Sequence, residues 1–397
     1  MALAVGVMFT ASAVADPIAD AQKLRGEDNA KAYAILKPLA EQGDPEAQTV
    51  LAGMYEANEV PGQQSGEAAE KSLFWLTKAA EGGGAEYQSN LGALLFYGDF
   101  GRRAPDPAQA IPWLEKAAAK GDSVAEFLLG QAFNEGLGVS EGSAEAAGWF
   151  QKAAEHGHEG AKLALAGLLA TGRGLPQDDR RAFEIYLGLA QKGSASAALA
   201  VAPFYMDGRG VKQDRVEGYA WLTTFAALSN DGYPEKTGPR DAAAQSLSFG
   251  EINEGQRRAL ELYRPNDWKD VLERVENPED GNIMKRASAG ELFLTGTLIP
   301  QNFPKAFEIF QKLADQGYAP GLLGLARMYE QGLGMEPDLV EAYKLYYIAR
   351  DRPFLEDDKY QAESGLLNLK LKMSEDLMDD ARKRAMKWQP KLPPEPL

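Results

Sequence analysis

Small and large apolar residues recur at fixed distances from a series of glycines in this chain. The glycines lie 36 to 40 residues apart, with one gap of 88 residues, and a stretch of helical periodicity stands on each side of them. A glycine in such a place can adopt the positive φ that ends a helix. The pattern therefore predicts a run of helix pairs around Gly43, Gly83, Gly121, Gly157, Gly193, Gly281 and Gly317.

The helix that precedes each glycine, the second helix of a pair, has one apolar stripe. In six copies a small residue stands eleven positions before the glycine and a large apolar residue stands seven before it. Offsets of three, four and seven positions share one face of an α-helix, so these columns should be buried together. The residue three positions before the glycine is alanine in all six copies: Ala40, Ala80, Ala118, Ala154, Ala190 and Ala314.

The helix that follows each glycine, the first helix of the next pair, has its own columns. The ninth residue after the glycine is small and the twelfth is large in all seven copies. A small column lets two helices approach closely, and a large column fills the layer between neighbouring pairs. The eighth position is apolar throughout and consists of Leu51, Leu91, Leu129, Leu165, Val201, Ala289 and Leu325.

One copy carries the clearest motif, made of Ala125, Leu129, Gly130, Phe133, Gly136, Gly138, Val139, Ala146, Trp149, Phe150, Lys152, Ala153, Ala154 and Gly157. It closely resembles the SEL-one-like repeat, a relative of the tetratricopeptide repeat, and the resemblance covers about residues 31–230 and 281–352. The resemblance implies an all-α fold, a right-handed α/α superhelical solenoid of about seven helix pairs with capping helices. It also implies a concave face that binds other proteins. A single pair cannot bury both of its faces, so stacking is compulsory.

The break in the period divides the predicted solenoid. We expect a signal peptide at 1–15, a first repeat array at 16–229, inserted capping helices and a loop at 230–280, and a second, shorter array at 281–353. C-terminal capping helices should follow at 354–388, and a disordered, Pro-rich tail at 389–397. Capping helices end such arrays with a polar outer face in place of the missing neighbour.

The N-terminus predicts export. Residues 2–11 are apolar and lead to Ala13 and Ala15, the small residues that a signal peptidase recognises, so cleavage is expected near Ala15, before Asp16. The mature protein would then be periplasmic or secreted. No Lys or Arg precedes the apolar run. A buried N-terminal helix, in a cytoplasmic interaction scaffold, is therefore the alternative.

Composition narrows the classes of partner. The formal net charge is −16, which disfavours nucleic acid because affinity for phosphate backbones rests on Lys and Arg. The sequence has no cysteine, which excludes disulfides and thiolate metal sites. No later segment has 18 uninterrupted apolar residues, so no membrane insertion is expected in the mature form.

The sequence offers little for catalysis. Ser140 lies in a G-x-S-x-G pattern, but the first glycine belongs to a Gly-x-Gly turn that recurs in other copies without the serine. His156 and His158, the two histidines, flank a repeat glycine and are interpreted as turn residues. We expect no enzyme activity, catalytic residue, cofactor or metal. The alternative is a hydrolase of cell-wall peptides or β-lactams, as described for cysteine-rich relatives.

The resemblance also names a binding surface. In related tetratricopeptide units, residues two before and two and five after the conserved leucine of the first helix face the groove. These positions are occupied here by Phe96, Phe127, Gln131, Asn134, Leu199, Pro203 and Met206. Phe127 and Leu199 could instead pack against the preceding pair. The resulting hypothesis is an exported, non-catalytic scaffold that binds a protein or peptide of unknown identity, as an adaptor or regulator of a cell-envelope process.

Overall fold

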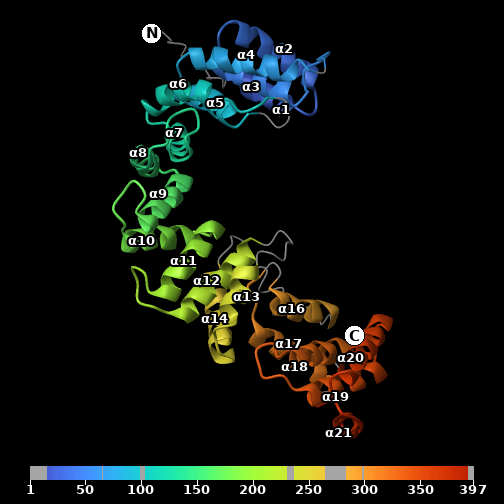
Figure 1. Ribbon diagram of the computed structural model, residues 1–397. Coiled ribbons are helices and arrows are strands. Elements are labelled where there is room, and N and C mark those ends of the chain that lie inside the picture. Colours follow the sequence, from blue (N-terminus) through green and yellow to red (C-terminus); the bar gives the residue numbers. More distant parts are fainter. Residues whose placement is uncertain are drawn as a thin grey trace, which may run out of the picture. The chain divides into compact units, whose positions relative to one another are not determined.

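The computed structural model describes residues 16–64, 66–98, 103–229, 237–263, 283–296 and 299–391 (Figure 1). Within these ranges there are twenty α-helices and no strand. The expected signal peptide, much of the insertion and the end of the expected tail lie outside them. The chain divides into two compact units, Met1–Gln177 and Asp178–Leu397, and each is described by itself.

Unit 1 consists of nine helices in its described residues. Each first helix (α3, α5, α7, α9) packs against the second helix before it, and α3, α5 and α7 also pack against the second helix that follows. This arrangement confirms the predicted all-α fold of repeated helix pairs. The bounds are α1 (Pro17–Leu24), α2 (Asn29–Glu41), α3 (Pro45–Glu56), α4 (Ala68–Glu81), α5 (Ala85–Tyr97), α6 (Pro107–Ala118), α7 (Ser123–Glu135), α8 (Ser143–Glu155) and α9 (Glu159–Thr171).

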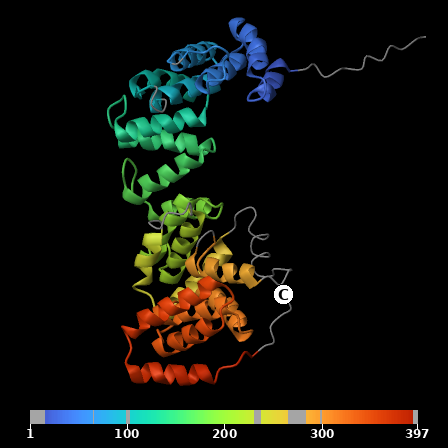
Figure 2. The same cartoon turned by 90° about the vertical axis from the view of Figure 1, so that its right-hand side faces the viewer.

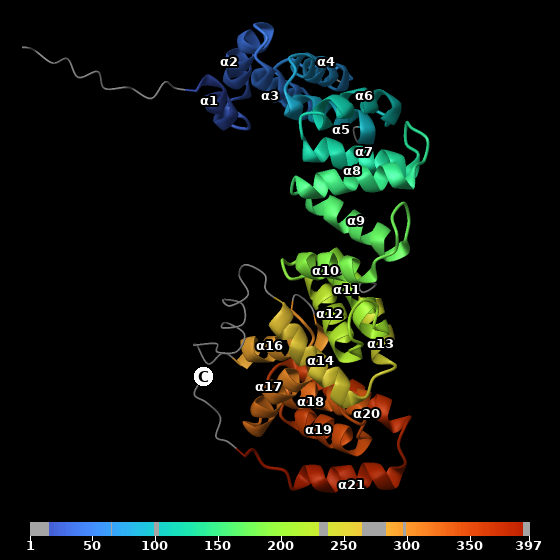
Figure 3. The same cartoon turned by 90° about the vertical axis from the view of Figure 1, so that its left-hand side faces the viewer.

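Unit 2 contains the remaining pairs and the capping helices (Figures 2 and 3). Its bounds are α10 (Asp179–Ala190), α11 (Ala195–Asp207), α12 (Arg215–Leu228), α13 (Gly238–Ala244), α14 (Phe249–Leu262), α16 (Ile283–Thr295), α17 (Phe303–Asp315), α18 (Ala319–Gln331), α19 (Leu339–Asp351), α20 (Glu356–Lys370) and α21 (Glu375–Met386). The pairs α11–α12, α16–α17 and α18–α19 repeat the packing of unit 1.

The small column of the first helices is a column of close helix contacts. A Cβ atom added at Gly92 would lie 2.4 Å from Leu114 Cδ2, and one at Gly130 would lie 2.5 Å from Phe150 Cδ1. In the second array, a Cβ at Gly290 would lie 2.5 Å from Phe310 Cε1. Large side chains of the second helices therefore pack directly on the backbone of the first helices, which is the role predicted for this column.

Most first and second helices start at a polar cap. The side chain before the helix accepts a hydrogen bond from the backbone N–H three residues further on, which satisfies a donor that the helix leaves unpaired. Asp44 does so for α3 at 2.9 Å and Asp122 for α7 at 2.8 Å. His158 takes the same place before α9, where its Nδ1 atom accepts from the N–H of Ala161 at 3.1 Å.

The Gly-x-Gly segments are tight turns, as predicted. Gly136, Gly138, Gly172 and Gly174 all have positive φ, between 67° and 72°. A Cβ atom at Gly174 would lie 2.0 Å from the carbonyl oxygen of Ser143, so this turn presses against the start of α8. Ser140 lies exposed in the corresponding turn between α7 and α8.

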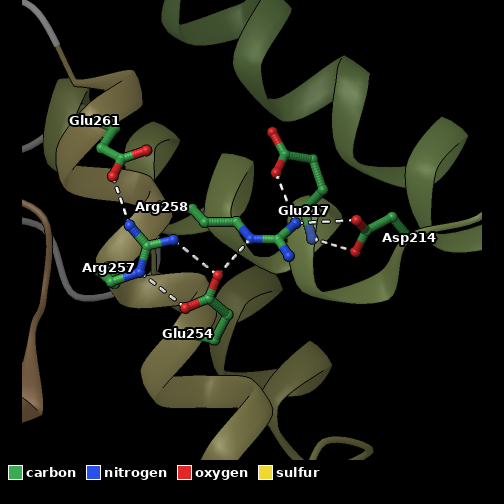
Figure 4. Close-up of polar contacts among 6 residues, drawn as sticks. All are labelled: Asp214, Glu217, Glu254, Arg257, Arg258 and Glu261. Carbon is green, nitrogen blue, oxygen red and sulfur yellow. Dashed lines mark hydrogen bonds and ion pairs between the residues drawn. The ribbon is translucent and has the colours of Figure 1, made fainter.

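Helix α14, from the inserted segment, fastens the first array to the second within unit 2. On one side Arg258 pairs with Asp214 at 2.9 Å and Glu217 at 3.1 Å, both at the start of α12 (Figure 4). On the other side Gln256 Oε1 accepts from the backbone N–H of Phe303 at 2.8 Å, at the start of α17. The inserted helix is thus a joint between repeats.

Glu254 holds the two arginines of α14 in place. Its carboxylate accepts hydrogen bonds from Arg257 at 2.8 Å and Arg258 at 2.9 Å (Figure 4). These bonds, first from Arg257 and then from Arg258, lower the pKa of Glu254 to about 2. Glu254 therefore stays ionised wherever the protein is folded near neutral pH, and it orients Arg258 toward α12.

The C-terminal helices differ from the polar caps expected by sequence. Helix α20 packs on α19, but its other face exposes Tyr360, Leu367 and Leu371. The outer face of α20 is therefore only partly polar, with these three apolar side chains exposed among polar ones such as Glu363 and Lys370. No helix in the described part of the chain is long and apolar enough to cross a membrane.

Candidate functional site

The groove positions predicted in unit 1 have unequal access to solvent. Phe96 is only 4% exposed and packs in the core with the pair α5–α6, so a ligand cannot reach its side chain. Phe127 is partly buried, stacks on the His158 ring at 4.3 Å and packs against Phe150 at 5.7 Å. Phe127 thus contacts its own second helix and the turn before α9, and its side chain remains partly exposed.

Gln131 and Asn134 are both partly exposed on α7. Gln131 Oε1 accepts a hydrogen bond from the Tyr97 hydroxyl at 2.7 Å and thereby links α7 to α5. Burial raises the pKa of Tyr97, and this hydrogen bond partly opposes the rise. Asn134 Oδ1 is buried and accepts no hydrogen bond from the described residues. Asn134 Oδ1 therefore has unused hydrogen-bonding capacity.

The positions predicted in unit 2 are also divided. Leu199 and Pro203 are exposed on α11. Met206 is partly buried and packs toward α12, since a Cβ atom at Gly218 would lie 2.5 Å from its Cγ atom. Leu199 and Pro203 thus form a small apolar surface, and Met206 belongs mainly to the contact within its own repeat.

A hollow of about 230 Å³ lies on the first helices of the second array. Its wall comes from α16, α18 and the start of α20, which are consecutive first-helix positions in unit 2. We call it the second-array hollow. Its lining residues are Met284, Ala287, Ser288, Glu291, Pro320, Leu323, Arg327, Leu355, Asp357, Asp358 and Gln361.

Four of these residues occupy the columns that the tetratricopeptide resemblance assigns to a groove. Ala287 and Leu323 stand six positions after Gly281 and Gly317, and Glu291 and Arg327 stand ten positions after them. These offsets are the ones that gave Phe127 and Gln131 in the third pair. The sequence analysis did not name them, although the same offsets, applied to the last two copies, would have found all four.

The polar side of the hollow has one cation and several carboxylates. Arg327 forms an ion pair with Glu291 across α16 and α18. Its Nε atom is buried and makes no hydrogen bond within the described structure. Asp358 caps α20 by accepting from the N–H groups of Phe354 and Leu355 at 2.9 and 2.7 Å, whereas Asp357 is exposed and contacts Gln361.

The apolar side of the hollow consists of a floor and a rim. Leu323 is buried and forms the floor. Met284 and Leu355 are 40% and 46% exposed and stand at the rim. An apolar cavity with a few placed polar groups is the usual form of a small recognition site. This hollow places an apolar floor next to the charged groups of Glu291, Arg327 and Asp357.

His156 and His158 make contacts within the fold, and Ser140 lies exposed in the turn between α7 and α8. His156 Nδ1 lies 2.7 Å from Glu126 Oε2, a buried carboxylate on α7. His158 caps α9 as described above. Among the described residues there is no group of three or more His, Cys, Asp or Glu side chains that could hold a metal ion.

Solved structures with related architecture include three bacterial proteins. A protective antigen of uropathogenic Escherichia coli strains with an SLR fold is 21% identical, covers 94% of this chain and 90% of its own, and has a TM-score of 0.45. A Sel1 repeat protein from Oxalobacter formigenes is 23% identical over 75% of this chain and 96% of its own, with a TM-score of 0.46. A putative Sel1 repeat protein from Klebsiella pneumoniae is 23% identical over 53% of this chain and 97% of its own, with a TM-score of 0.34.

A search of curated proteins found no match. The family model for the Sel1 repeat matches seven segments: residues 45–84, 85–122, 123–158, 161–194, 195–230, 287–318 and 319–353. Each match includes helices that the structure shows as first and second members of a pair. The matched segments make up more than half of the chain, and the chain therefore belongs to the Sel1 repeat family.

Proposed function

We propose that this protein is a non-catalytic scaffold that binds a segment of another protein along its first helices, with the second-array hollow as its most specific contact. Proteins of the Sel1 repeat family are generally scaffolds for protein interaction. The observation that carries the proposal is the composition of the hollow: an apolar floor and rim next to Glu291, Arg327 and Asp357.

The charges indicate the chemistry of the segment. Three carboxylates and one guanidinium line the hollow, and the whole chain has a net charge of −16. A segment with an apolar side chain next to Lys or Arg would bury its apolar part against Leu323 and Met284. Its cation would lie near Asp357. Opposite charges at the rim mainly raise the association rate and the specificity of such a contact.

A peptide library tests this proposal. Random peptides displayed on phage are selected on the full chain, and the recovered peptides are synthesised and titrated by calorimetry. We expect an apolar residue beside Lys or Arg in the recovered sequences, and an affinity that falls as salt rises. Peptides without a basic residue, or with acidic residues in its place, would contradict the proposed charge preference.

Variants locate the bound peptide. Leu355→Ala and Asp357→Asn remove an exposed apolar and an exposed charged group from the rim, so each should weaken binding about tenfold, equivalent to about 1.4 kcal/mol. Glu308→Gln on α17, an exposed carboxylate outside the hollow, is the matched control and should bind normally. If the control alone reduces affinity, the peptide binds to the second helices and the proposal is wrong.

We also propose that the protein is exported and acts in the cell envelope. The support is the apolar run at residues 2–11 followed by Ala13 and Ala15. N-terminal sequencing of protein recovered from the periplasm or medium should start at Asp16. Recovery of an intact Met1 terminus from the cytoplasm would contradict export.

A further inference from the structure

Helix α20 occupies the place of a first helix that lacks its partner. It packs on α19 as each first helix packs on the second helix before it, and a Cβ atom at Gly365 would lie 2.5 Å from the Tyr346 ring of α19. The next helix, α21, packs on α19 instead of pairing with α20 as a second helix would (Figures 1 and 3). The face of α20 turned away from α19 is left without an intramolecular cover in the described structure.

This face carries a regular apolar stripe. Tyr360, Leu367 and Leu371 are 72%, 62% and 85% exposed, and Ser364 completes the row at offsets of four, seven and eleven from Tyr360. Residues at such offsets lie on one side of an α-helix, where they can pack against a second helix. Isolated exposed apolar residues are common on protein surfaces, but an aligned row at the end of a repeat array is not a polar cap.

The charges beside the stripe are self-complementary. Glu363 and Lys370 are both exposed and lie seven residues apart, on the same edge of the stripe. When two identical helices pack face to face and antiparallel, the same edges of the two helices meet. Glu363 of one copy then lies opposite Lys370 of the other, and the two-fold symmetry produces this pair twice.

We propose that the uncovered face of α20 binds the α20 face of a second copy of this chain, as an antiparallel helix pair. In this arrangement Tyr360 of one copy contacts Leu371 of the other, and Leu367 contacts Ser364. The acidic first turn of α20, with Glu356, approaches the basic last turn with Lys370. Opposed helix directions also pair the favourable ends of the two helix dipoles.

The small size of this contact predicts a weak, reversible dimer. Three apolar side chains per copy bury much less than the roughly 1,600 Å² of a standard interface. The dimer should therefore dissociate on dilution, and high salt should weaken its charged pairs. This inference does not depend on the proposed peptide site, because the apolar stripe is separate from the lining of the hollow.

Sedimentation equilibrium of the full chain over a wide concentration range tests the dimer. The wild type should shift from monomer to dimer as concentration rises. Leu367→Glu places a charge in the centre of the stripe and should abolish the shift. Met386→Glu changes an exposed apolar residue on α21, outside the stripe, and is the matched control that should dimerise like the wild type.

Charge exchange tests the antiparallel register. Glu363→Lys and Lys370→Glu each place like charges opposite one another, so each should weaken the dimer about tenfold or more. The double variant Glu363→Lys, Lys370→Glu restores both pairs with reversed sign and should recover the wild-type dimer. A chain that stays monomeric at all concentrations would overturn the proposal. A dimer that survives Leu367→Glu, or a double variant that fails to recover, would equally show that another surface or a partner helix occupies this face.

Discussion

At the residue scale, two glycines of unit 1 have opposite structural roles. Gly174 has a φ of 70° and lies against the carbonyl oxygen of Ser143, whereas Gly148 is an exposed position inside α8 with no atom near its missing Cβ. Gly174→Ala should lower the free energy of unfolding by about 1–3 kcal/mol. Gly148→Ala should raise it by about 0.5–1 kcal/mol, because alanine favours a helix interior. Urea unfolding followed by circular dichroism measures both free energies of unfolding. Equal changes for the two variants would contradict the opposite roles of Gly174 and Gly148.

His158 makes the start of α9 sensitive to pH. Its Nδ1 atom must be unprotonated to accept the hydrogen bond from Ala161, and burial lowers its pKa, although the nearby Asp122 carboxylate partly opposes this. The folded state therefore favours neutral His158. Its contribution to stability is complete above the unfolded pKa of about 6.5 and is lost as pH falls below that value.

The variant His158→Asp isolates this effect. Asp occupies the same cap position before α3 and α7 and accepts the hydrogen bond without needing a neutral ring. When the pH is lowered from 7.5 to 5.5, the melting temperature of the wild type should fall relative to that of His158→Asp. These two pH values lie on either side of the ordinary histidine pKa of about 6.5. His156, which contacts Glu126, is retained in both proteins and serves as a common background. A difference between the two proteins that stays constant with pH would show that the cap does not titrate.

At the element scale, the second helices are held by their large apolar column. Phe150 is buried and lies on the backbone of α7 at Gly130, so Phe150→Ala should cost about 3–5 kcal/mol. Phe74, on α4, is half exposed and serves as the control; Phe74→Ala should cost less than about 1 kcal/mol. The comparison of denaturation midpoints checks the prediction, and similar losses for both variants would mean that the column does not determine packing.

The ion pairs that join α14 to α12 can be tested with the two adjacent arginines of α14. Arg258 reaches Asp214 and Glu217 on α12, whereas Arg257 pairs only with Glu254 and Glu261 of its own helix in the described contacts. Arg258→Met should lower the free energy of unfolding of this joint by about 1–3 kcal/mol. Arg257→Met should change it by less than about 0.5 kcal/mol. Hydrogen exchange of α14 measures the difference in stability between the two variants. The two variants would exchange alike if apolar packing alone held the helix.

The sequence was sufficient to predict the elements but only part of the site. Periodic columns report contacts between neighbours in the chain, and so the helix pairs and the close approach at Gly130 could be predicted. Phe96 was assigned to a groove and proved to be buried, because the same offset faces the core when the next pair packs closely. The second-array hollow needs Leu355 and Asp357 of α20, which lies outside the repeat period. The link from Gln256 to Phe303 spans 47 residues and has no periodic signal at all.

At the scale of the whole molecule, repetition determines how stability is distributed along the chain. Each pair contacts mainly its neighbours, so substitutions in separate pairs should have nearly additive effects on stability. The first helices of successive pairs have equivalent positions, and the side chains at those positions differ from pair to pair, for example Phe127 and Leu323. The proposed function assigns specificity to individual residues such as Arg327 and Asp357, on a backbone that every pair shares.

Hydrogen–deuterium exchange of the full chain, with and without one of the selected peptides, shows whether the peptide binds along the first helices of the second array. We expect slower exchange in α16, α18 and the first turn of α20 when the peptide is bound, and unchanged exchange in α17 and α19. Slower exchange confined to the second helices, or no change around the second-array hollow at saturating peptide, would contradict it.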